Sequence, residues 1–260
     1  MTQAIMGTIV TIDVVRPSPE ATAAIERAFG WFHEIEERCT RFDERSELRQ
    51  LMARPGEIVE VSSILFETLR FAIMVARESG GAFDPAAGNW REIELVPERN
   101  AITLRKPLTL DLGAVAKGLA VDTAARELAP FRDFAIDAGG DLYLGGTNPT
   151  GAAWSVGIRH PRREREMIET VQVSNQAVCT SGDYERGAHI LDPRTGTESA
   201  GVASATVVAP GAMLADALAT AAFVLGPKDG IAFLRRMGVE GLIVTSNLER
   251  HQTRGLKHAA

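Results

Sequence analysis

The stretch from Val202 to Gly226 reads VASATVVAPGAMLADALATAAFVLG, and it carries the clearest information about the fold. Its first part, Ala203–Val208, is rich in valine and threonine and predicts a β-strand. Pro210 interrupts that pattern. The following residues, Met213–Leu225, are apolar on nearly every side, which is typical of a helix buried in a protein core. The sequence therefore predicts a strand and an interior helix in direct succession.

Further short strands precede this stretch. Because turn signals rather than helical segments separate them, they favour an antiparallel sheet over repeated βαβ units. These predicted strands are Trp154–Ile158, Val171–Val173, Ala177–Thr180 and His189–Leu191.

The first half of the chain adds strands and three helices. Strands are predicted over Ile5–Val15, within Ala101–Leu112 and around Phe134–Ile136. Capping residues and 3–4 apolar spacing predict helices from Ser18 to about Cys39, from Ser62 to Gly80 and from about Gly113 to Leu128. The expected fold class is α+β, a single α/β unit over residues 1–260 with a mixed, largely antiparallel sheet and flanking helices.

Composition excludes several classes of protein. The 260 residues are 45% hydrophobic, which suffices for a large core, and 28 basic against 34 acidic residues give a net charge of −6. This charge disfavours a nucleic-acid partner. Cys39 and Cys179 stand far apart without metal-ligand spacing, so neither a zinc site nor a disulfide framework is indicated.

No membrane span is expected, because Pro210 and Asp216 break the longest apolar stretch into charge-free pieces shorter than the roughly 18–20 residues a spanning helix needs. The segment Met1–Gly7 contains no lysine or arginine and lacks a signal-peptide layout. The expected location is the cytoplasm, with a leader removed beforehand as the alternative.

Asp216 is anomalous in its apolar helix. A buried carboxylate is costly unless it is paired, hydrogen-bonded or metal-bound, and Thr220 lies four residues on, on the same helical face. A carboxylate with a hydroxyl suits Mg²⁺ or Ca²⁺. A helix cap or an arginine partner for Asp216 is the alternative explanation.

The segment Asp111–Gly118 joins a predicted strand to the first turn of a helix. There, backbone N–H groups and Lys117 can converge on a phosphate. The Walker spacing is absent, so a tight turn with a solvated lysine is the alternative. The segment Gly139–Asp141 likewise allows a ligand close to the backbone, or is only a hairpin turn. His189 enters an Asp-Pro-Arg-Thr-Gly turn from a strand, where a histidine is either structural or catalytic.

Nine motifs in order closely resemble the ApbE family, the FAD:protein FMN transferases, over roughly residues 6 to 226. They are Met6–Thr8, Phe42–Leu48, Gly81–Pro85, Asp111–Gly118 with Asp122, Gly139–Asp141, Trp154–Ile158, Thr180–Tyr184, His189–Gly196 and Ala215–Thr220.

The resemblance implies FAD in a deep cleft, with Mg²⁺ beside its pyrophosphate. The implied metal ligands are Asp216, Thr220 and the main-chain carbonyl of Ala114. The positions implied to contact the flavin and nucleotide are Met6, Phe42, Ala82, Phe83, Asp84, Asp111, Lys117 and Leu191, and the turns at Gly140 and Thr180 are expected to hold the pyrophosphate and its AMP half.

The implied reaction transfers FMN from FAD to a Thr or Ser hydroxyl of a target protein and releases AMP. Mg²⁺ and Lys117 can neutralise the phosphate oxygens. His189 is the candidate base, because its unperturbed pKa lies near working pH, and Asp183 is a second candidate. The alternatives are an FAD pyrophosphatase that yields FMN and AMP, and a non-catalytic FAD-binding or assembly protein.

Four departures from the family pattern bear on these implications. The segments Trp90–Asp111 and Tyr184–His189 are shorter than the family usually carries. Phe42 replaces a common flavin-stacking tyrosine, which keeps the ring and loses the hydroxyl. Ala219 replaces an acidic residue that some relatives place beside the metal, which predicts a lower metal affinity.

Overall fold

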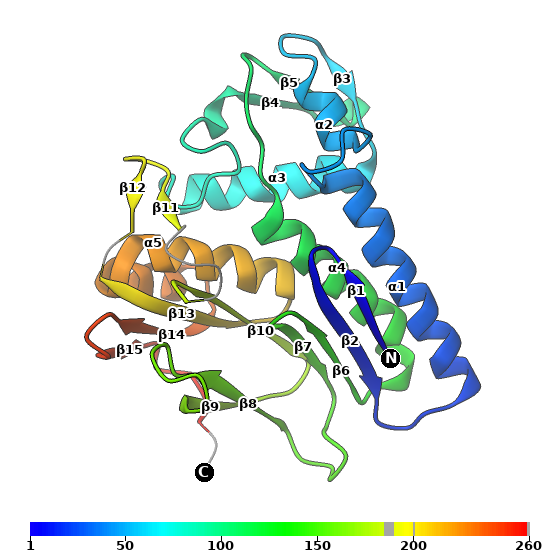
Figure 1. Ribbon diagram of the computed structural model, residues 1–260, viewed down its shortest axis with the longest axis vertical. Coiled ribbons are helices and arrows are strands. Elements are labelled where there is room, and N and C mark those ends of the chain that lie inside the picture. Colours follow the sequence, from blue (N-terminus) through cyan, green and yellow to red (C-terminus); the bar gives the residue numbers. More distant parts are fainter. Residues whose placement is uncertain (185–189, 200, 259–260) are drawn as a thin grey trace.

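An eight-stranded sheet forms the centre of the protein in this computed structural model (Figure 1), which describes residues 1–184, 190–199 and 201–258. Its strand order is β1-β2-β6-β7-β10-β13-β14-β15, and every pairing given within it is antiparallel. The strands are β1 Thr2–Ile5, β2 Thr8–Val14, β6 Phe134–Ala138, β7 Asp141–Gly145, β10 Gln176–Gly182, β13 Val202–Ala209, β14 Glu240–Thr245 and β15 Arg250–Gln252.

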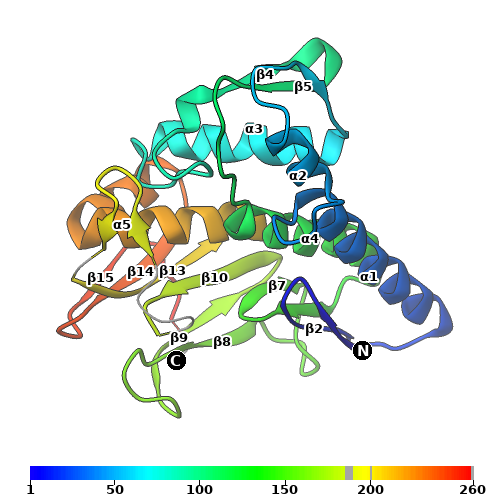
Figure 2. The same cartoon turned by 45° about the horizontal axis from the view of Figure 1, so that its top comes forward.

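Both faces of this sheet are covered, as Figure 2 shows. Helices α4 (Gly113–Leu128) and α5 (Ala212–Arg236) lie on one face, and α1 (Pro19–Cys39) packs on α4. The hairpin β8 (Trp154–Arg159) and β9 (Met167–Val173) covers the other face.

Strand β13 is buried along its whole length because of this double cover. Alternate side chains of a strand point to opposite faces. Ala205 and Val207 therefore enter the helix-side core, whereas Val208 packs in the second core beneath the β8–β9 hairpin.

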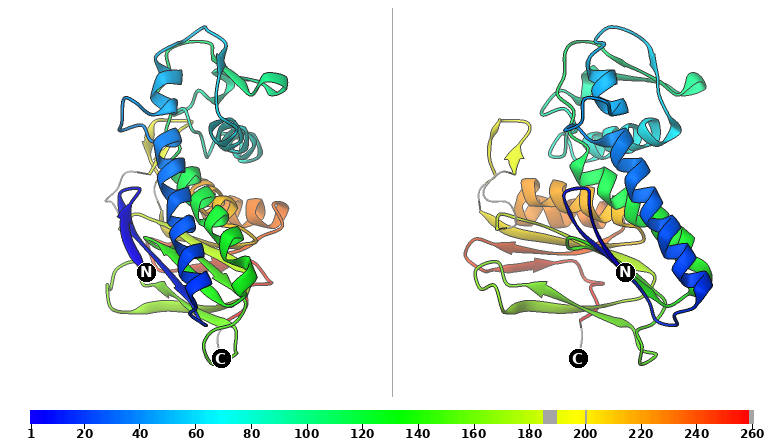
Figure 3. Two further views of the ribbon diagram at one scale, coloured as in Figure 1. Left: turned by 90° about the vertical axis from the view of Figure 1, so that its right-hand side faces the viewer. Right: turned by 45° about the vertical axis from the view of Figure 1, so that its right-hand side comes forward.

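A smaller layer lies on the opposite side of the molecule from the β8–β9 hairpin, as Figure 1 shows. It contains α2 (Glu47–Met52), α3 (Ser63–Glu78) and the three-stranded sheet β3-β5-β4. Its strands are β3 Val59–Glu60, β4 Ile93–Val96 and β5 Ala101–Leu104, and short 3₁₀ turns lie at Trp90–Glu92, Pro97–Arg99 and Ala129–Phe131. A separate hairpin, β11 (Leu191–Asp192) and β12 (Thr197–Glu198), stands beside the segment that follows α3 (Figure 3).

The predicted helices of the first half agree closely with the structure. Ser18 and Ser62 cap α1 and α3 through their side-chain oxygens, and α4 begins at Gly113 and ends at Leu128 as predicted. The α+β class and the largely antiparallel sheet are confirmed.

Other predicted elements differ from the structure. The single strand predicted over Ile5–Val15 is a hairpin of β1 and β2, which turns at Met6 and Gly7 with φ angles of 53° and 69°. Within Ala101–Leu112 only the first four residues form a strand. The predicted helix Met213–Leu225 extends as α5 to Arg236 across a kink, because Gly226 has a φ of 81° and Pro227 follows it.

By length and composition alone, helix α5 is long and apolar enough to cross a membrane. In the fold, 56% of its most apolar window is buried, as expected for a core helix.

Candidate active site

A cavity of about 500 Å³ is lined by the start of α4 and the first half of α5. It contains ten of the residues predicted for the site, all in its lining. They are Ala82, Phe83, Asp84, Asp111, Ala114, Lys117, Thr180, Leu191, Asp216 and Thr220. Segments far apart in the sequence therefore bring most of the predicted positions to one hollow.

Helices α4 and α5 supply the three predicted metal ligands. Ala114 lies in the first turn of α4, and Asp216 and Thr220 lie one turn apart on α5. Asp216 is only 7% exposed, and the hydroxyl of Thr220 is 3.1 Å from the hydroxyl of Ser181 on β10. The donors are a carboxylate, a hydroxyl and a carbonyl, which are the hard oxygen ligands that Mg²⁺ prefers.

This donor set fits Mg²⁺ better than a transition metal. Among the described residues no cluster of three or more His, Cys, Asp or Glu side chains exists that could hold a metal ion. Mg²⁺ is usually bound by one or two carboxylates together with water and substrate phosphates, so a single carboxylate in a cavity that also contains a lysine suits it.

Lys117 supplies positive charge inside the cavity, in addition to the lining residue Arg41. Its ammonium group forms an ion pair with Asp141 and donates to the carbonyl of Ala138 at 3.3 Å. Burial acts to lower the pKa of Lys117, but the carboxylates of Asp141 and Asp216 outweigh it and raise that pKa above its ordinary value. Lys117 is therefore held charged in a position to meet an anion.

Asp141 is a cavity residue that the sequence analysis did not assign to the site. Its side chain is 4% exposed, and it starts β7 directly after the Gly139–Gly140 turn. The motif located the turn, but pairing with Lys117 depends on packing α4 against β7. In the sequence, the only indication of the ion pair between Asp141 and Lys117 was a carboxylate that follows two glycines.

Asp84 orders the loop that forms one wall. Its carboxylate accepts the N–H of Ala86 at 2.7 Å and the N–H of Trp90 at 3.3 Å. Burial raises the pKa of Asp84 although these hydrogen bonds act to lower it. The side chain therefore shapes the wall through its own loop.

Asp111 stands at the edge of the cavity. One carboxylate oxygen accepts the N–H of Gly113 at 2.8 Å, and the other lies 3.2 Å from Nε of Arg41. The side chain is more than half exposed, so it is accessible to a ligand at the cavity mouth.

The β11–β12 hairpin closes another side of the cavity. Asp192 and Arg194 form a bidentate pair within it, with nitrogen–oxygen distances of 2.8 and 2.7 Å. A Cβ atom at Gly88 would lie 2.6 Å from the carbonyl oxygen of Pro193. The loop after α3 and the hairpin therefore touch where Gly88 has no side chain.

Three residues predicted to bind the cofactor do not line the cavity. Met6 lies in the β1–β2 turn, and Gly140 has a φ of 96° in the turn before β7, where its N–H donates to Asp137. Phe42 is 83% exposed and lies in the loop between α1 and α2.

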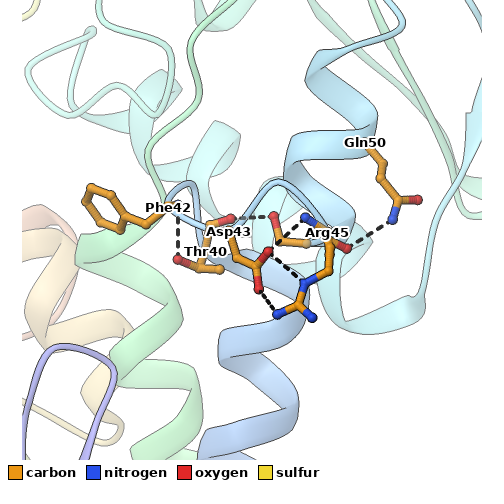
Figure 4. Close-up of polar contacts among 6 residues, drawn as sticks. Thr40, Phe42, Asp43, Arg45 and Gln50 are labelled. Atoms are coloured by element: carbon orange, nitrogen blue, oxygen red, sulfur yellow. Dashed lines mark hydrogen bonds and ion pairs between the residues drawn. The ribbon is translucent and has the colours of Figure 1, made fainter.

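The loop that carries Phe42 is ordered by its neighbours (Figure 4). Asp43 forms two hydrogen bonds to the guanidinium of Arg45, at 3.2 and 2.9 Å, and Gln50 donates to the Arg45 carbonyl at 3.0 Å. The Phe42 ring points away from this group, with the guanidinium of Arg41 4.6 Å from its centroid. Arg41 lines the cavity, so Phe42 stands one residue outside it.

Of the two candidate bases, Asp183 and His189, only Asp183 is among the residues that the structure describes. Asp183 follows β10 and forms a bidentate ion pair with Arg162, at 2.6 and 2.7 Å, outside the cavity lining. In this arrangement its carboxylate is occupied by an arginine. His189 lies outside the described residues, so its role stays a prediction.

A second cavity, of about 600 Å³, lies between α1, α3 and α4. None of the predicted site residues lines it. Its charged groups include Arg27 and Glu127, which pair with each other at 3.1 Å. The chemistry of the site therefore belongs to the first cavity, although that one is smaller.

Comparisons with known proteins agree with the architecture. The ApbE family model matches residues 6–93 and 86–243. A FAD:protein FMN transferase of Treponema pallidum is 33% identical, over 92% of this chain and 82% of the relative. That of Haemophilus influenzae is 34% identical over 60% of this chain and only 50% of its own length.

Solved structures show the same fold. The ApbE protein of Thermotoga maritima superposes with a TM-score of 0.88 at 26% identity, covering 98% of this chain and 96% of the other. The flavin transferase ApbE of Vibrio cholerae also has a TM-score of 0.88, at 22% identity and with 97% and 95% coverage. The chain belongs to the ApbE family.

Proposed function

We propose that this protein transfers FMN from FAD to a Thr or Ser hydroxyl of a target protein in a Mg²⁺-dependent reaction and releases AMP. The observation that carries the proposal is the meeting of Lys117 on α4 with Asp216 and Thr220 on α5 in one cavity. The relative from Treponema pallidum, which this chain matches over most of its length, is named a FAD:protein FMN transferase.

The reaction is a substitution at phosphorus. The acceptor hydroxyl oxygen attacks the phosphorus on the flavin side of the FAD pyrophosphate, the bond to the bridging oxygen breaks, and AMP leaves with that oxygen. The hydroxyl proton passes to a base, for which His189 is the first candidate. The product is FMN joined to the protein through a phosphodiester bond.

Residues of this chain contribute charge and orientation. Lys117, which Asp141 holds in place, offsets negative charge on the nonbridging phosphate oxygens. Asp216, Thr220 and the Ala114 carbonyl are the groups that would hold Mg²⁺. When bound, the ion supplies further charge neutralisation and orients the phosphates.

The flavin and nucleotide ends of FAD are proposed to contact the walls of the cavity. Ala82, Phe83 and Asp84 form one wall, and Asp111 and Leu191 lie at other sides of the same hollow. Phe42 and Gly140 are proposed contacts at its margin, because each is the chain neighbour of a lining residue, Arg41 and Asp141 respectively. Met6, in the turn between β1 and β2, is proposed as a further contact. The hydroxyl of Thr180 is held by a hydrogen bond with the hydroxyl of Thr206, and the two oxygens are 2.8 Å apart.

The whole chain is proposed to act as one unit, because the main core includes buried residues from Ile5 to Ile243. A cytoplasmic location is part of the proposal. It agrees with both cysteines being free and buried, since disulfides are rare in cytosolic proteins.

The test is incubation with FAD and Mg²⁺ in the presence of peptides that contain Thr or Ser, and of matched peptides with Ala at those positions. Mass spectrometry follows the peptides and chromatography follows AMP and FMN. Transfer predicts AMP together with a peptide that gains FMN only when the hydroxyl is present. AMP with free FMN instead indicates the pyrophosphatase, and bound FAD without AMP indicates a binding protein.

Asp216→Ala serves as the matched inactive variant. The substitution is not expected to unfold the helix, since alanine is the residue that helix interiors tolerate best. Loss of AMP release with an unchanged circular dichroism spectrum supports the metal assignment. Full activity of the Asp216→Ala variant without added metal contradicts the metal assignment.

A further inference from the structure

The N-terminus of helix α5 is capped by a residue of another helix. Gly211 stands at the N-cap position and has no side chain to accept the free N–H groups of the first turn. The carboxylate of Asp122 in α4 accepts them instead, from Ala212 to Oδ1 at 2.6 Å and from Met213 to Oδ2 at 3.0 Å. Asp122 therefore joins two helices whose contacting residues are 90 positions apart.

The two helices pack closely beside this cap. At Gly118 the backbone of α4 lies against the backbone of α5, and at Gly211 the backbone at the start of α5 lies against the side chain of Asp122. A Cβ atom at Gly118 would lie 2.5 Å from the backbone of Met213, and one at Gly211 would lie 2.9 Å from Oδ2 of Asp122. Atoms do not pack at such distances without displacement. Glycine at both positions thus permits a crossing that Asp122 then fastens by hydrogen bonds.

This crossing carries the proposed metal ligands. On α4, Ala114, Gly118 and Asp122 recur every four residues and share one face. On α5, Asp216 lies one turn after the capped residues, and Thr220 follows one turn later. Any shift of α5 against α4 therefore moves Asp216 and Thr220 relative to Ala114.

We propose that Asp122 is a positioning residue for the metal site. It holds the first turn of α5 on α4 and so sets the separation between Ala114 on one helix and Asp216 and Thr220 on the other. The proposal rests on the Mg²⁺ assignment made under the proposed function. Mg²⁺ demands near-octahedral geometry, so its affinity is sensitive to small movements of a ligand.

The experiment separates positioning from simple helix capping. Asp122→Ala removes both hydrogen bonds. In Asp122→Ala/Gly211→Ser, a serine at the N-cap restores a side-chain cap within α5, and its Cβ occupies space that the lost carboxylate leaves free. The tether to α4 is not restored. Mn²⁺ binding to the purified protein is measured by electron paramagnetic resonance, with and without FAD, and Tm is measured without metal.

Positioning predicts that Asp122→Ala lowers Tm by about 2–6 °C and weakens Mn²⁺ binding by about 10–100-fold. The double variant regains most of the Tm but keeps the weakened Mn²⁺ binding. Asp133→Ala is the matched control, because Asp133 also accepts two hydrogen bonds, both from Thr147, away from the cavity. It is expected to lower Tm and leave Mn²⁺ binding unchanged.

Recovery of both Tm and Mn²⁺ affinity in the double variant overturns the proposal, since Asp122 is then only a helix cap. Equal Mn²⁺ affinity in all folded variants overturns it too. A wild-type protein that binds no Mn²⁺ overturns the metal assignment itself, and positioning with it. If Asp122→Ala does not fold, Asp122→Asn keeps one acceptor and is expected to weaken Mn²⁺ binding severalfold with a near-normal Tm. Unchanged binding in that variant contradicts the proposal.

Discussion

Replacing Asp141 by alanine tests the buried ion pair at the centre of the cavity. The side chains of Asp141 and Lys117 are 4% and 16% exposed, so the variant leaves an ammonium group largely out of water. Removing one partner of a buried pair costs about 3–5 kcal/mol of the free energy of unfolding. The carbonyl of Ala138 and the carboxylate of Asp216 still face Lys117, which places the expected loss near the lower end, at about 3 kcal/mol.

For a chain of this size, a loss of about 3 kcal/mol corresponds to a fall in Tm of about 6–12 °C. The assay is urea unfolding followed by circular dichroism, with Tm from calorimetry. Lys117→Met/Asp141→Leu replaces the pair by apolar groups and is expected to remain within about 1.5 kcal/mol of the wild type. Glu60→Ala, which breaks an exposed pair with Arg99, is the control and should shift Tm by less than about 2 °C.

The reasoning depends on coupling between the two charges. It is refuted if the losses measured for Asp141→Ala and Lys117→Met add to the loss of a Lys117→Met/Asp141→Ala double variant within about 0.5 kcal/mol. Additivity would mean that neither charge is left uncompensated when the other is removed.

Gly118→Ala is expected to destabilise the protein by about 1–3 kcal/mol, because its Cβ would lie 2.5 Å from the α5 backbone. Gly30→Ala on α1, where nothing lies within 4 Å of the added atom, should stabilise by about 0.5–1 kcal/mol in the same urea titration. Burial raises the pKa of Cys39 to about 12 and that of Cys179 well above its ordinary value, so neither thiol should react with iodoacetamide at pH 8 until urea unfolds the chain, as peptide mass spectrometry can check. His189→Ala should lower saturated turnover by about 10²–10⁴ with little change in FAD affinity by flavin fluorescence, and the reverse pattern would make it a ligand contact.

Local signals in the sequence were sufficient for α1 and α3, but they did not predict α2 or the extension of α5 to Arg236. Ser18 and Ser62 cap their helices through atoms only three residues away, so the boundaries of α1 and α3 depend on neighbours in the sequence. The turn at Met6 was missed for the opposite reason. Met6 has a positive φ, which is uncommon for a non-glycine residue, so its residue type does not indicate a turn. The turn occurs together with the antiparallel pairing of β1 with β2.

The site shows the same division. Asp216 and Thr220 are one turn apart on a single helix, so their shared face could be predicted from spacing. The pairing of Asp141 with Lys117 joins a strand to a helix, and the cap that Asp122 provides crosses between helices. Contacts of this kind depend on packing between elements, which periodicity does not describe.

The cap on α5 also has a consequence for how the chain is made. Synthesis runs from the N-terminus, so Asp122 leaves the ribosome well before the helix whose first turn it completes. The helix cannot acquire its cap from its own sequence, because Gly211 offers no side chain. Assembly of the cavity thus waits for the late part of the chain to dock on the early part, so a nascent fragment that ends before α5 would present Lys117 without Asp216 and Thr220.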